Sequence, residues 1–175
     1  LTPDVAHRPM MATAVAVLEV VRAAGVVNAR IKWPNDVVVG GRKLAGILAE
    51  SSVIGGRVDW VVVGVGLNVN WSAAEIPAEL SSVATSLALE TGRTYALDDV
   101  RATLIVAWEC ALGLADPYDA WRAGSLPVGE SVAVHVGNRV VAGRIAGYER
   151  SGALIVDRDD GVSETLSAGD LVRGV

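Results

Sequence analysis

The 175-residue sequence predicts an α/β (α+β) fold: a mixed, largely antiparallel sheet packed with helices, followed by a small β-barrel. Three observations predict it. An apolar helix-forming run covers residues 10–24, Val-rich segments separated by glycine turns cover 29–66, and short strand-like runs broken by Gly and Asp follow residue 128. The change of character at 124–127 predicts two units, residues 1–125 and residues 126–175.

The first element is the apolar helix over residues 10–24. Pro9 suits its first turn and Gly25 suits the position after its end. Because apolar residues cover nearly every face, we expect this helix to be buried between the sheet and another layer.

Strands are expected over residues 29–33, 37–39, 43–50 and 59–66. The pairs Gly40–Gly41 and Gly55–Gly56 are tight-turn signals, and strands joined by tight turns pair antiparallel. Leu and Ala in residues 43–50 leave a helix open for that segment.

A polar loop over residues 71–82 is followed by predicted helices at 83–90, 100–114 and 117–123. Asp98 or Asp99 is the expected N-cap of the second of these helices. The single cysteine, Cys110, excludes a disulfide within the chain and is expected to be a small core residue. One cysteine also fits a reducing cytoplasm.

The C-terminal region contains five strand-like runs in about 50 residues, which predicts a small barrel. The runs are 131–136, 139–148, 153–156, 164–166 and 171–173, with hairpin turns at 136–139 and 158–161.

Charge and hydropathy argue against two classes of partner, nucleic acid and membrane. The formal net charge is −5 without a basic stripe, which argues against tight nucleic-acid binding. The longest apolar stretch, residues 10–27, is interrupted by Glu19 and Arg22, so we expect no membrane span.

The segment Lys32-Trp33-Pro34-Asn35-Asp36 follows a predicted strand. Pro34 restricts both its own backbone and that of Trp33, so the chain leaves the strand rigidly. An amide and a carboxylate beside a cation can orient a phosphate and supply oxygen ligands to Mg²⁺. The alternative is an ordinary turn in which Asn35 and Asp36 bond their own backbone.

A second lysine, Lys43, opens the run Lys43-Leu44-Ala45-Gly46-Ile47-Leu48. Strict alternation places Lys43 on the face of Ala45 and Ile47, from which it could reach an anion. Gly46 indicates a close backbone approach or a bulge that resets the alternation. The alternative for Lys43 is a solvated lysine at a strand end.

The third segment is Gly64-Val65-Gly66-Leu67-Asn68. In an extended strand, Gly64, Gly66 and Asn68 share one face. A bare backbone lets a flat ligand lie on the sheet while Asn68 bonds its polar edge. The alternative is a packing accommodation for the apolar helix. The segment lacks the third glycine of a dinucleotide fingerprint.

These three blocks, in this order and spacing, closely resemble the signature blocks of biotin protein ligases. Ala84-Thr85-Ser86-Leu87 resembles the adenine-side segment of that family, and the region from Pro127 resembles its C-terminal SH3-like barrel. The resemblance covers nearly the whole chain.

The resemblance implies a cytoplasmic enzyme that uses biotin and ATP with Mg²⁺. Biotinyl-5′-AMP would form first, and biotin would then pass to a lysine of a biotin carboxyl carrier domain. It also allows a homodimer. Lys43 would be catalytic and bind the biotin carboxylate and α-phosphate region, and Gly46, Gly64 and Gly66 would line the biotin and adenylate floor. On the nucleotide and metal side it implies Lys32, Asn35, Asn68, Thr85 and Ser86 for ATP, and Asp36 for Mg²⁺.

The sequence departs from the family pattern at its start. The family has a Gly-Arg-rich loop and a Ser-Thr-Asn segment before the apolar helix, and neither occurs in these residues. We therefore expect a partial catalytic domain, whose activity alone is in question. A non-catalytic biotin-binding or carrier-docking fragment and a lipoate-ligase-like acyl-adenylate enzyme are the alternatives.

Overall fold

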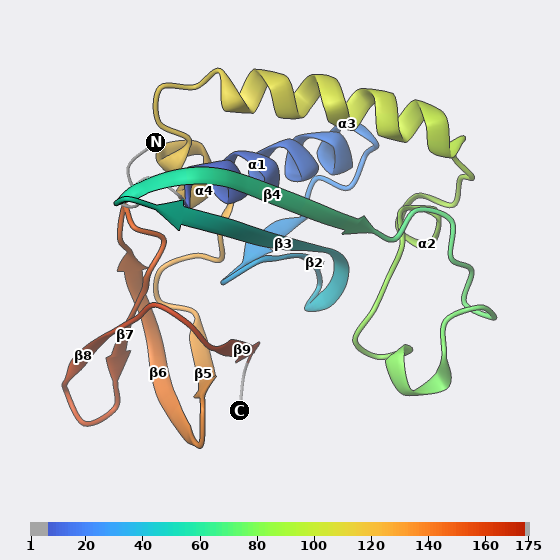
Figure 1. Cartoon of the computed structure of the whole chain (residues 1–175). Coiled ribbons are helices and arrows are strands. Elements are labelled where there is room, and N and C mark those ends of the chain that lie inside the picture. Colours follow the sequence, from blue (N-terminus) through green and yellow to red (C-terminus); the bar gives the residue numbers. More distant parts are fainter. Residues whose placement is uncertain (1–6, 174–175) are drawn as a thin grey trace.

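The computed structural model describes residues 7–173, so the expectation about the start of the chain concerns residues outside the described part. Helix α1 (Arg8–Ala23) has Pro9 in its first turn, and its residues 11–18, 20 and 21 are buried. It lies between the first sheet and helix α3 (Leu97–Leu112), as Figure 1 shows. The predicted burial of this helix between two layers is confirmed, because an all-apolar surface needs cover on every side.

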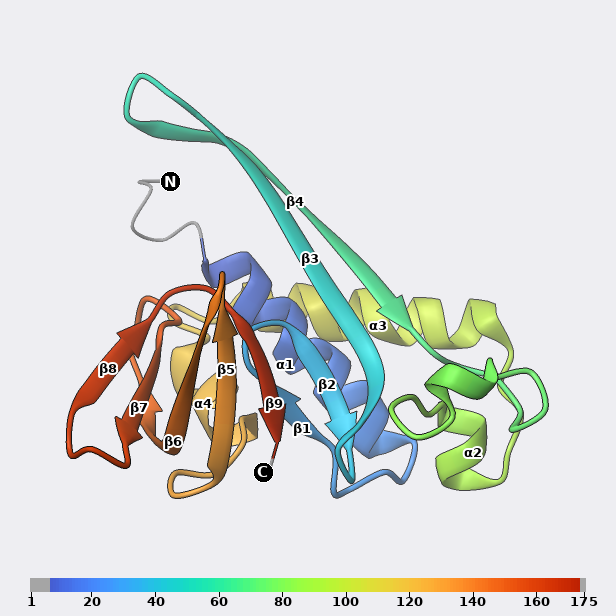
Figure 2. The same cartoon turned by 90° about the horizontal axis from the view of Figure 1, so that it is seen from below.

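The first sheet is fully antiparallel and has the strand order β1-β2-β3-β4. Its strands are β1 (Arg30–Lys32), β2 (Asp36–Val39), β3 (Arg42–Ile54) and β4 (Arg57–Leu67). The helical alternative for residues 43–50 is wrong, since they lie within β3. Strands β3 and β4 form a long hairpin whose tip stands away from the body (Figure 2).

A β-bulge at Leu44 interrupts the pairing of β2 with β3. Val37 is opposite Ala45 and Val38 is opposite Lys43, so Leu44 has no partner in the register. An extra residue shifts the alternation of side chains by one position. Lys43 is therefore exposed while Ala45 and Ile47 are buried, and the predicted common face for these three residues is wrong.

Two of the helices after the sheet begin at other residues than predicted. Helix α2 (Leu87–Thr91) begins four residues later than expected, because Ser86 is its extended N-cap. Helix α3 has Ala96 as its N-cap, without a side-chain bond, so the predicted caps Asp98 and Asp99 lie inside its first turn. A short 3-10 turn (Ala78–Leu80) lies in the polar loop, and α4 (Tyr118–Gly124) ends the first unit.

Cys110 in α3 is exposed, so its predicted burial is wrong. Only one side of α3 faces α1 (Figure 1), and the cysteine is among the exposed residues of this helix.

The C-terminal sheet is antiparallel with the order β8-β7-β6-β5-β9 and forms the predicted SH3-like β-domain. Its strands are β5 (Ser131–Val136), β6 (Arg139–Tyr148), β7 (Leu154–Arg158), β8 (Ser163–Leu166) and β9 (Asp170–Arg173). The predicted division at residue 125 lies between α4 and β5.

One hydrophobic cluster extends through both sheets, from Met11 in α1 to Leu171 in β9. Trp121 stacks edge-on against Tyr148 with ring centroids 5.2 Å apart. The indole nitrogen of Trp33 donates to Gly152 O at 2.9 Å, and Leu126 N donates to Ile31 O at 3.0 Å. The loop before Asn35 is therefore fixed against the C-terminal domain.

Candidate functional site

The loop from Trp33 to Asn35 joins two directly paired strand ends, since Lys32 is opposite Asp36. Trp33 is buried, and the Trp33–Pro34 peptide bond is cis. The side-chain amide of Asn35 donates to Ile47 O at 2.9 Å, and Ile47 N donates to Asn35 O at 2.8 Å. Asn35 thus bonds β3 and not its own turn, and it holds the loop beside that strand.

Asp36 lies between the two lysines. Its Oδ1 atom is 2.6 Å from Lys43 Nζ and its Oδ2 atom is 3.5 Å from Lys32 Nζ. The carboxylate is 11% exposed, whereas the Lys43 side chain is 50% exposed. The short contact of Oδ1 is an ion pair without the angles of a hydrogen bond, and this buried oxygen has no hydrogen-bond partner among the described residues. It can therefore accept a further ligand.

The ammonium group of Lys43 lies directly over Gly46. A Cβ atom at Gly46 would be 2.9 Å from Lys43 Nζ and 3.6 Å from Asp36 Oδ1. The bulge at Leu44 produces this arrangement, because it brings Lys43 to the face of Gly46. Lys43 is thus half-exposed and ion-paired, and not simply a solvated strand end.

Gly46 and Gly66 are directly opposite each other in the β3–β4 ladder, and Gly64 is opposite Leu48. Gly64 and Gly66 are exposed, whereas Val63, Val65 and their neighbours on the other face pack against the core that contains α1. The glycines do not accommodate the apolar helix, which lies on the opposite face. We call Gly46, Gly64 and Gly66 the glycine floor; it is a bare, open area beneath Lys43.

Asn68 closes one end of the glycine floor. Its side-chain amide donates to Thr85 O at 3.0 Å, and its main-chain N donates to Leu44 O at 2.9 Å. Thr85 N donates in turn to Lys43 O at 2.9 Å. Asn68 therefore ties the segment before α2 to the strand that carries the lysine.

Thr85 and Ser86 are fully buried and their hydroxyl groups have internal partners. The Thr85 hydroxyl donates to Glu90 Oε1 at 2.5 Å. Ser86 Oγ donates to Trp71 O at 2.6 Å and accepts from Leu89 N at 3.1 Å. These bonds fix the backbone next to Lys43, and in this conformation they leave both hydroxyls directed into the protein.

Two acidic residues near the predicted site were missed from sequence. Glu90 Oε1 accepts a hydrogen bond from the Thr85 hydroxyl and forms an ion pair with Arg42, whose Nη2 atom is 2.8 Å away. Asp170 of β9 has its Oδ1 atom 3.8 Å from Lys32 Nζ. No local spacing could indicate Asp170, since it lies in the C-terminal sheet and 138 positions separate it from Lys32.

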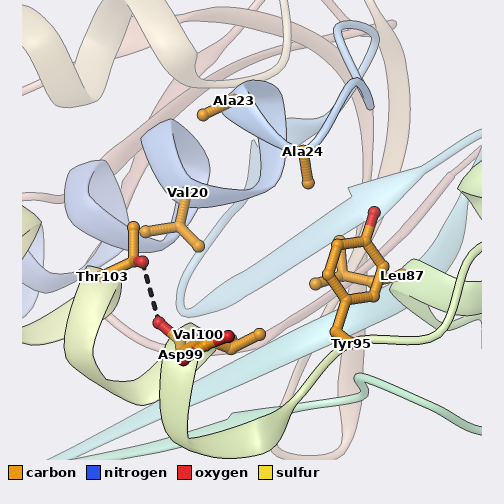
Figure 3. A pocket seen from close by; sticks show the side chains of 8 residues that line it. All are labelled: Val20, Ala23, Ala24, Leu87, Tyr95, Asp99, Val100 and Thr103. Atoms are coloured by element: carbon orange, nitrogen blue, oxygen red, sulfur yellow. Dashed lines mark hydrogen bonds between the residues drawn. The ribbon is translucent and has the colours of Figure 1, made fainter.

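A pocket elsewhere in the protein is not part of this site. A cavity of about 230 Å³ lies between α1, α2 and α3. Figure 3 shows its lining, which includes the apolar side chains of Val20, Leu87 and Val100. Its Thr103 hydroxyl is bonded to Asp99 O at 2.8 Å. The cavity contains none of the predicted site residues.

Two global features bear on ligands. Among residues 7–173, no three His, Cys, Asp or Glu side chains are grouped closely enough to hold a metal ion. Within the same residues, the helices are too short or too polar to cross a bilayer.

Known proteins match the chain in both of its parts. The family model described as "Biotin/lipoate A/B protein ligase family" matches residues 2–68, and "Biotin protein ligase C terminal domain" matches residues 128–174. The chain is 30% identical over 161 residues to the bifunctional ligase/repressor BirA of Bacillus spizizenii, covering 89% of this chain and 50% of that protein. It is 37% identical over 153 residues to the biotin--[acetyl-CoA-carboxylase] ligase of Mycobacterium tuberculosis, covering 82% and 52%. The chain spans about half the length of these curated relatives.

Solved structures have the same fold. The apo biotin protein ligase of Aquifex aeolicus superimposes with a TM-score of 0.77 at 24% identity, covering 99% of this chain and 80% of that one. The complex of that ligase with biotin and ATP superimposes with a TM-score of 0.72 at 23% identity, covering 94% and 72%.

Proposed function

We propose, from the premise that this chain belongs to the biotin protein ligase family, that it carries the lysine-bearing part of an active site. The proposed reaction is the ATP-dependent attachment of biotin to a lysine of a biotin carboxyl carrier domain. The biotin carboxylate attacks the α-phosphorus of ATP and releases pyrophosphate. The carrier lysine then attacks the acyl carbon of biotinyl-5′-AMP and releases AMP.

The observation that carries the proposal is the position of Lys43 over the glycine floor. The carboxylate and the α-phosphate are both anionic, and negative charge builds on the α-phosphate oxygens as the carboxylate attacks, so a fixed cation there lowers their repulsion and stabilises the transition state. Without ligand, Asp36 holds Lys43 there at 2.6 Å. The bare backbone of Gly46, Gly64 and Gly66 gives the biotin and adenylate a flat surface.

ATP is proposed to extend from this floor toward the segment before α2. Asn68 contacts the nucleotide side, and Lys32 and Asn35 lie on the phosphate side. Because the hydroxyls of Thr85 and Ser86 have internal partners, we assign these two residues the role of presenting their backbone and fixing the adenine-side wall.

The residues present fit Mg²⁺ only as an ion shared with ATP. Mg²⁺ is commonly bound by one or two carboxylates together with substrate phosphates, and there it neutralises phosphate charge. Asp36 offers one buried carboxylate with an oxygen that lacks a hydrogen bond, and Asn35 offers an amide oxygen nearby. A cytoplasmic location, a homodimer and the lack of nucleic-acid binding stay predictions from the sequence.

The test is the affinity of the 175-residue chain for a non-hydrolysable biotinyl-adenylate analogue, measured by calorimetry. Lys43→Ala should weaken binding roughly 10- to 100-fold, because a charge-assisted hydrogen bond contributes about 1.5–3 kcal/mol. Arg57→Ala, at the far tip of the β3–β4 hairpin, is the control and should leave the affinity unchanged. Equal affinities for wild type and Lys43→Ala, or no binding by wild type, would defeat the proposal.

A further inference from the structure

Three arginines lie around β1, at one edge of the first sheet. Arg22 is in the last turn of α1, Arg30 begins β1, and Arg122 is in α4. Strand β1 also forms a parallel bridge with the end of α4 through Ile31 and Ser125, which brings these elements side by side.

Two of these arginines converge on a single oxygen. Arg22 Nη2 and Arg30 Nη1 each donate to Ala29 O at 3.0 Å. Since both nitrogen atoms lie at this distance from one oxygen, they are separated by no more than twice that distance. Two like charges are therefore held close together.

Within the described part of the chain, these three arginines form no ion pair with a carboxylate. Among residues 7–173, none of the ion pairs includes Arg22, Arg30 or Arg122, whereas five other arginines are paired: Arg42, Arg101, Arg139, Arg150 and Arg158. The buried Nε atom of Arg22 has no hydrogen-bond partner. Burial, and then repulsion from Arg30, lower the pKa of Arg22.

The carbonyl end of α1 does not account for this cluster. A helix C-terminus favours nearby positive charge. That end already receives Arg93, whose Nη2 atom donates to Ala24 O at 2.5 Å. The carbonyl end of α1 is thus already paired with one cation, and Arg22 and Arg30 place two more cations near it.

A cavity of about 450 Å³ opens beside the cluster, and Arg30 and Arg122 both line it. Ser125 and Tyr148 also line it, but their hydroxyls already donate to Trp121 O and Leu126 O. The guanidinium groups are thus its available charged donors, and they are opposed by the carboxylate of Asp119. The volume is typical of small-molecule sites.

We propose that Arg30 and Arg122, supported by the charge of Arg22, bind the phosphate group of a small molecule in this cavity. The fork of a guanidinium matches the oxygen atoms of a phosphate. Apolar residues of the same cavity, Leu126 and Val128, can contact an organic group attached to that phosphate. No residue of this cavity belongs to the Lys43 site, so the proposal goes beyond the proposed function.

The experiment is calorimetric titration of the 175-residue chain with inorganic phosphate and with phenyl phosphate at constant ionic strength. Arg122→Gln should weaken binding roughly tenfold or more, because a charge-assisted contact is lost. Asp119→Asn should strengthen binding, because it removes the opposing charge. Tighter binding of phenyl phosphate identifies a phosphomonoester as the ligand, and equal binding identifies free phosphate.

Two further variants separate this site from the Lys43 site. Arg101→Gln removes an exposed arginine of α3 and should leave phosphate affinity unchanged, as should Lys43→Ala. Loss of phosphate binding in Lys43→Ala would assign the binding to the other site and overturn the inference. Unchanged affinity in Arg122→Gln, or no phosphate binding by wild type, would also overturn it. Circular dichroism verifies that each variant is folded; Arg122, Asp119 and Arg101 are exposed, so their replacement spares the core.

Discussion

Asp36 neutralises two lysines at once from a buried position. Asp36→Asn keeps the shape of the side chain but leaves Lys32 and Lys43 close together without the carboxylate. We expect the free energy of unfolding, measured by urea denaturation, to fall by about 1–3 kcal/mol.

The control for Asp36→Asn is Asp98→Asn. Asp98 also pairs with a cation, Arg101 at 2.7 Å, but both of these side chains are largely exposed. Exposed pairs contribute about 0–1 kcal/mol, so this change should have little effect. Equal losses in the two variants would contradict the central position given to Asp36.

The glycine floor predicts a separation of stability from ligand affinity. A Cβ atom at Gly66 would meet only Gly46 O at 3.9 Å, which is ordinary contact. Gly66→Ala should therefore change the free energy of unfolding by less than about 1 kcal/mol. The added methyl group stands on the open floor, so affinity for the biotinyl-adenylate analogue should fall roughly tenfold or more.

Gly46→Ala should reduce that affinity further than Gly66→Ala, since its Cβ atom would lie 2.9 Å from Lys43 Nζ and displace the ammonium group. Calorimetry and urea denaturation on the same samples provide the two readouts. Unfolding of Gly66→Ala would contradict the predicted small effect on stability, and full retention of its affinity would show that the floor is not the ligand surface.

At the scale of elements, α2 depends on one hydroxyl. Ser86 caps the helix by accepting from Leu89 N and also bonds Trp71 O. Ser86→Ala should lower the free energy of unfolding by about 1–2 kcal/mol, which is the usual effect of removing an N-cap. Ser81→Ala is the matched control, because its exposed hydroxyl bonds only Ala78 O and should matter little.

Element types followed from local pattern, whereas several boundaries did not. The ranges 131–136 and 139–148 were predicted as the structure has them, because glycine turns delimit Val-rich runs. The start of α2 was not, because residues 83–86 look helix-compatible in sequence. Lys43 N donates to Val83 O at 2.7 Å and Thr85 N donates to Lys43 O at 2.9 Å, and this pairing with β3 keeps the segment out of the helix.

The proximity of the candidate site residues was predictable, but their geometry was not. Three short motifs predicted Lys43, Asp36 and the glycine floor, and the structure brings these residues together. Alternation alone placed Lys43 on the wrong face, since the bulge at Leu44 depends on pairing with β2. Cys110 was misplaced for a similar reason: composition cannot tell which side of an apolar helix is left uncovered.

At the scale of the whole molecule, the two sheets are joined through buried hydrogen bonds. Tyr148 of β6 is the clearest case, because its hydroxyl donates to Leu126 O at 3.0 Å while Tyr118 OH donates to Tyr148 O at 2.5 Å. Trp33, next to the site, is fixed by the same domain. Movement of the C-terminal domain would therefore reach the loop that holds Asp36.

This junction predicts a pH dependence of stability. Burial, and then the Glu130 carboxylate, raise the pKa of Tyr148 above its ordinary value of 10.0. The folded state keeps the phenol proton after the unfolded state has lost it. The contribution of the protonated phenol to the free energy of unfolding is therefore complete below pH 10 and is lost as the pH rises further.

Tyr148→Phe removes this titration. At neutral pH it should cost about 1 kcal/mol for the lost hydrogen bond. Its free energy of unfolding should then decline less steeply than that of wild type from about pH 9 to about pH 11, measured by urea denaturation at each pH. Parallel curves for the two proteins would refute the raised pKa.

The bulge at Leu44 decides on which face of β3 the lysine lies. If Leu44 took a regular place in the pleat, Lys43 would turn to the side of Ala45 and Ile47, so an ammonium group would enter hydrocarbon surroundings while the surface above Gly46 lost its cation. Deleting Leu44 has the opposite outcome, because Lys43 would then directly precede Ala45 and stay on the face of Gly46. A strand shorter by one residue can therefore keep the same surface, provided that the missing residue is the bulged one.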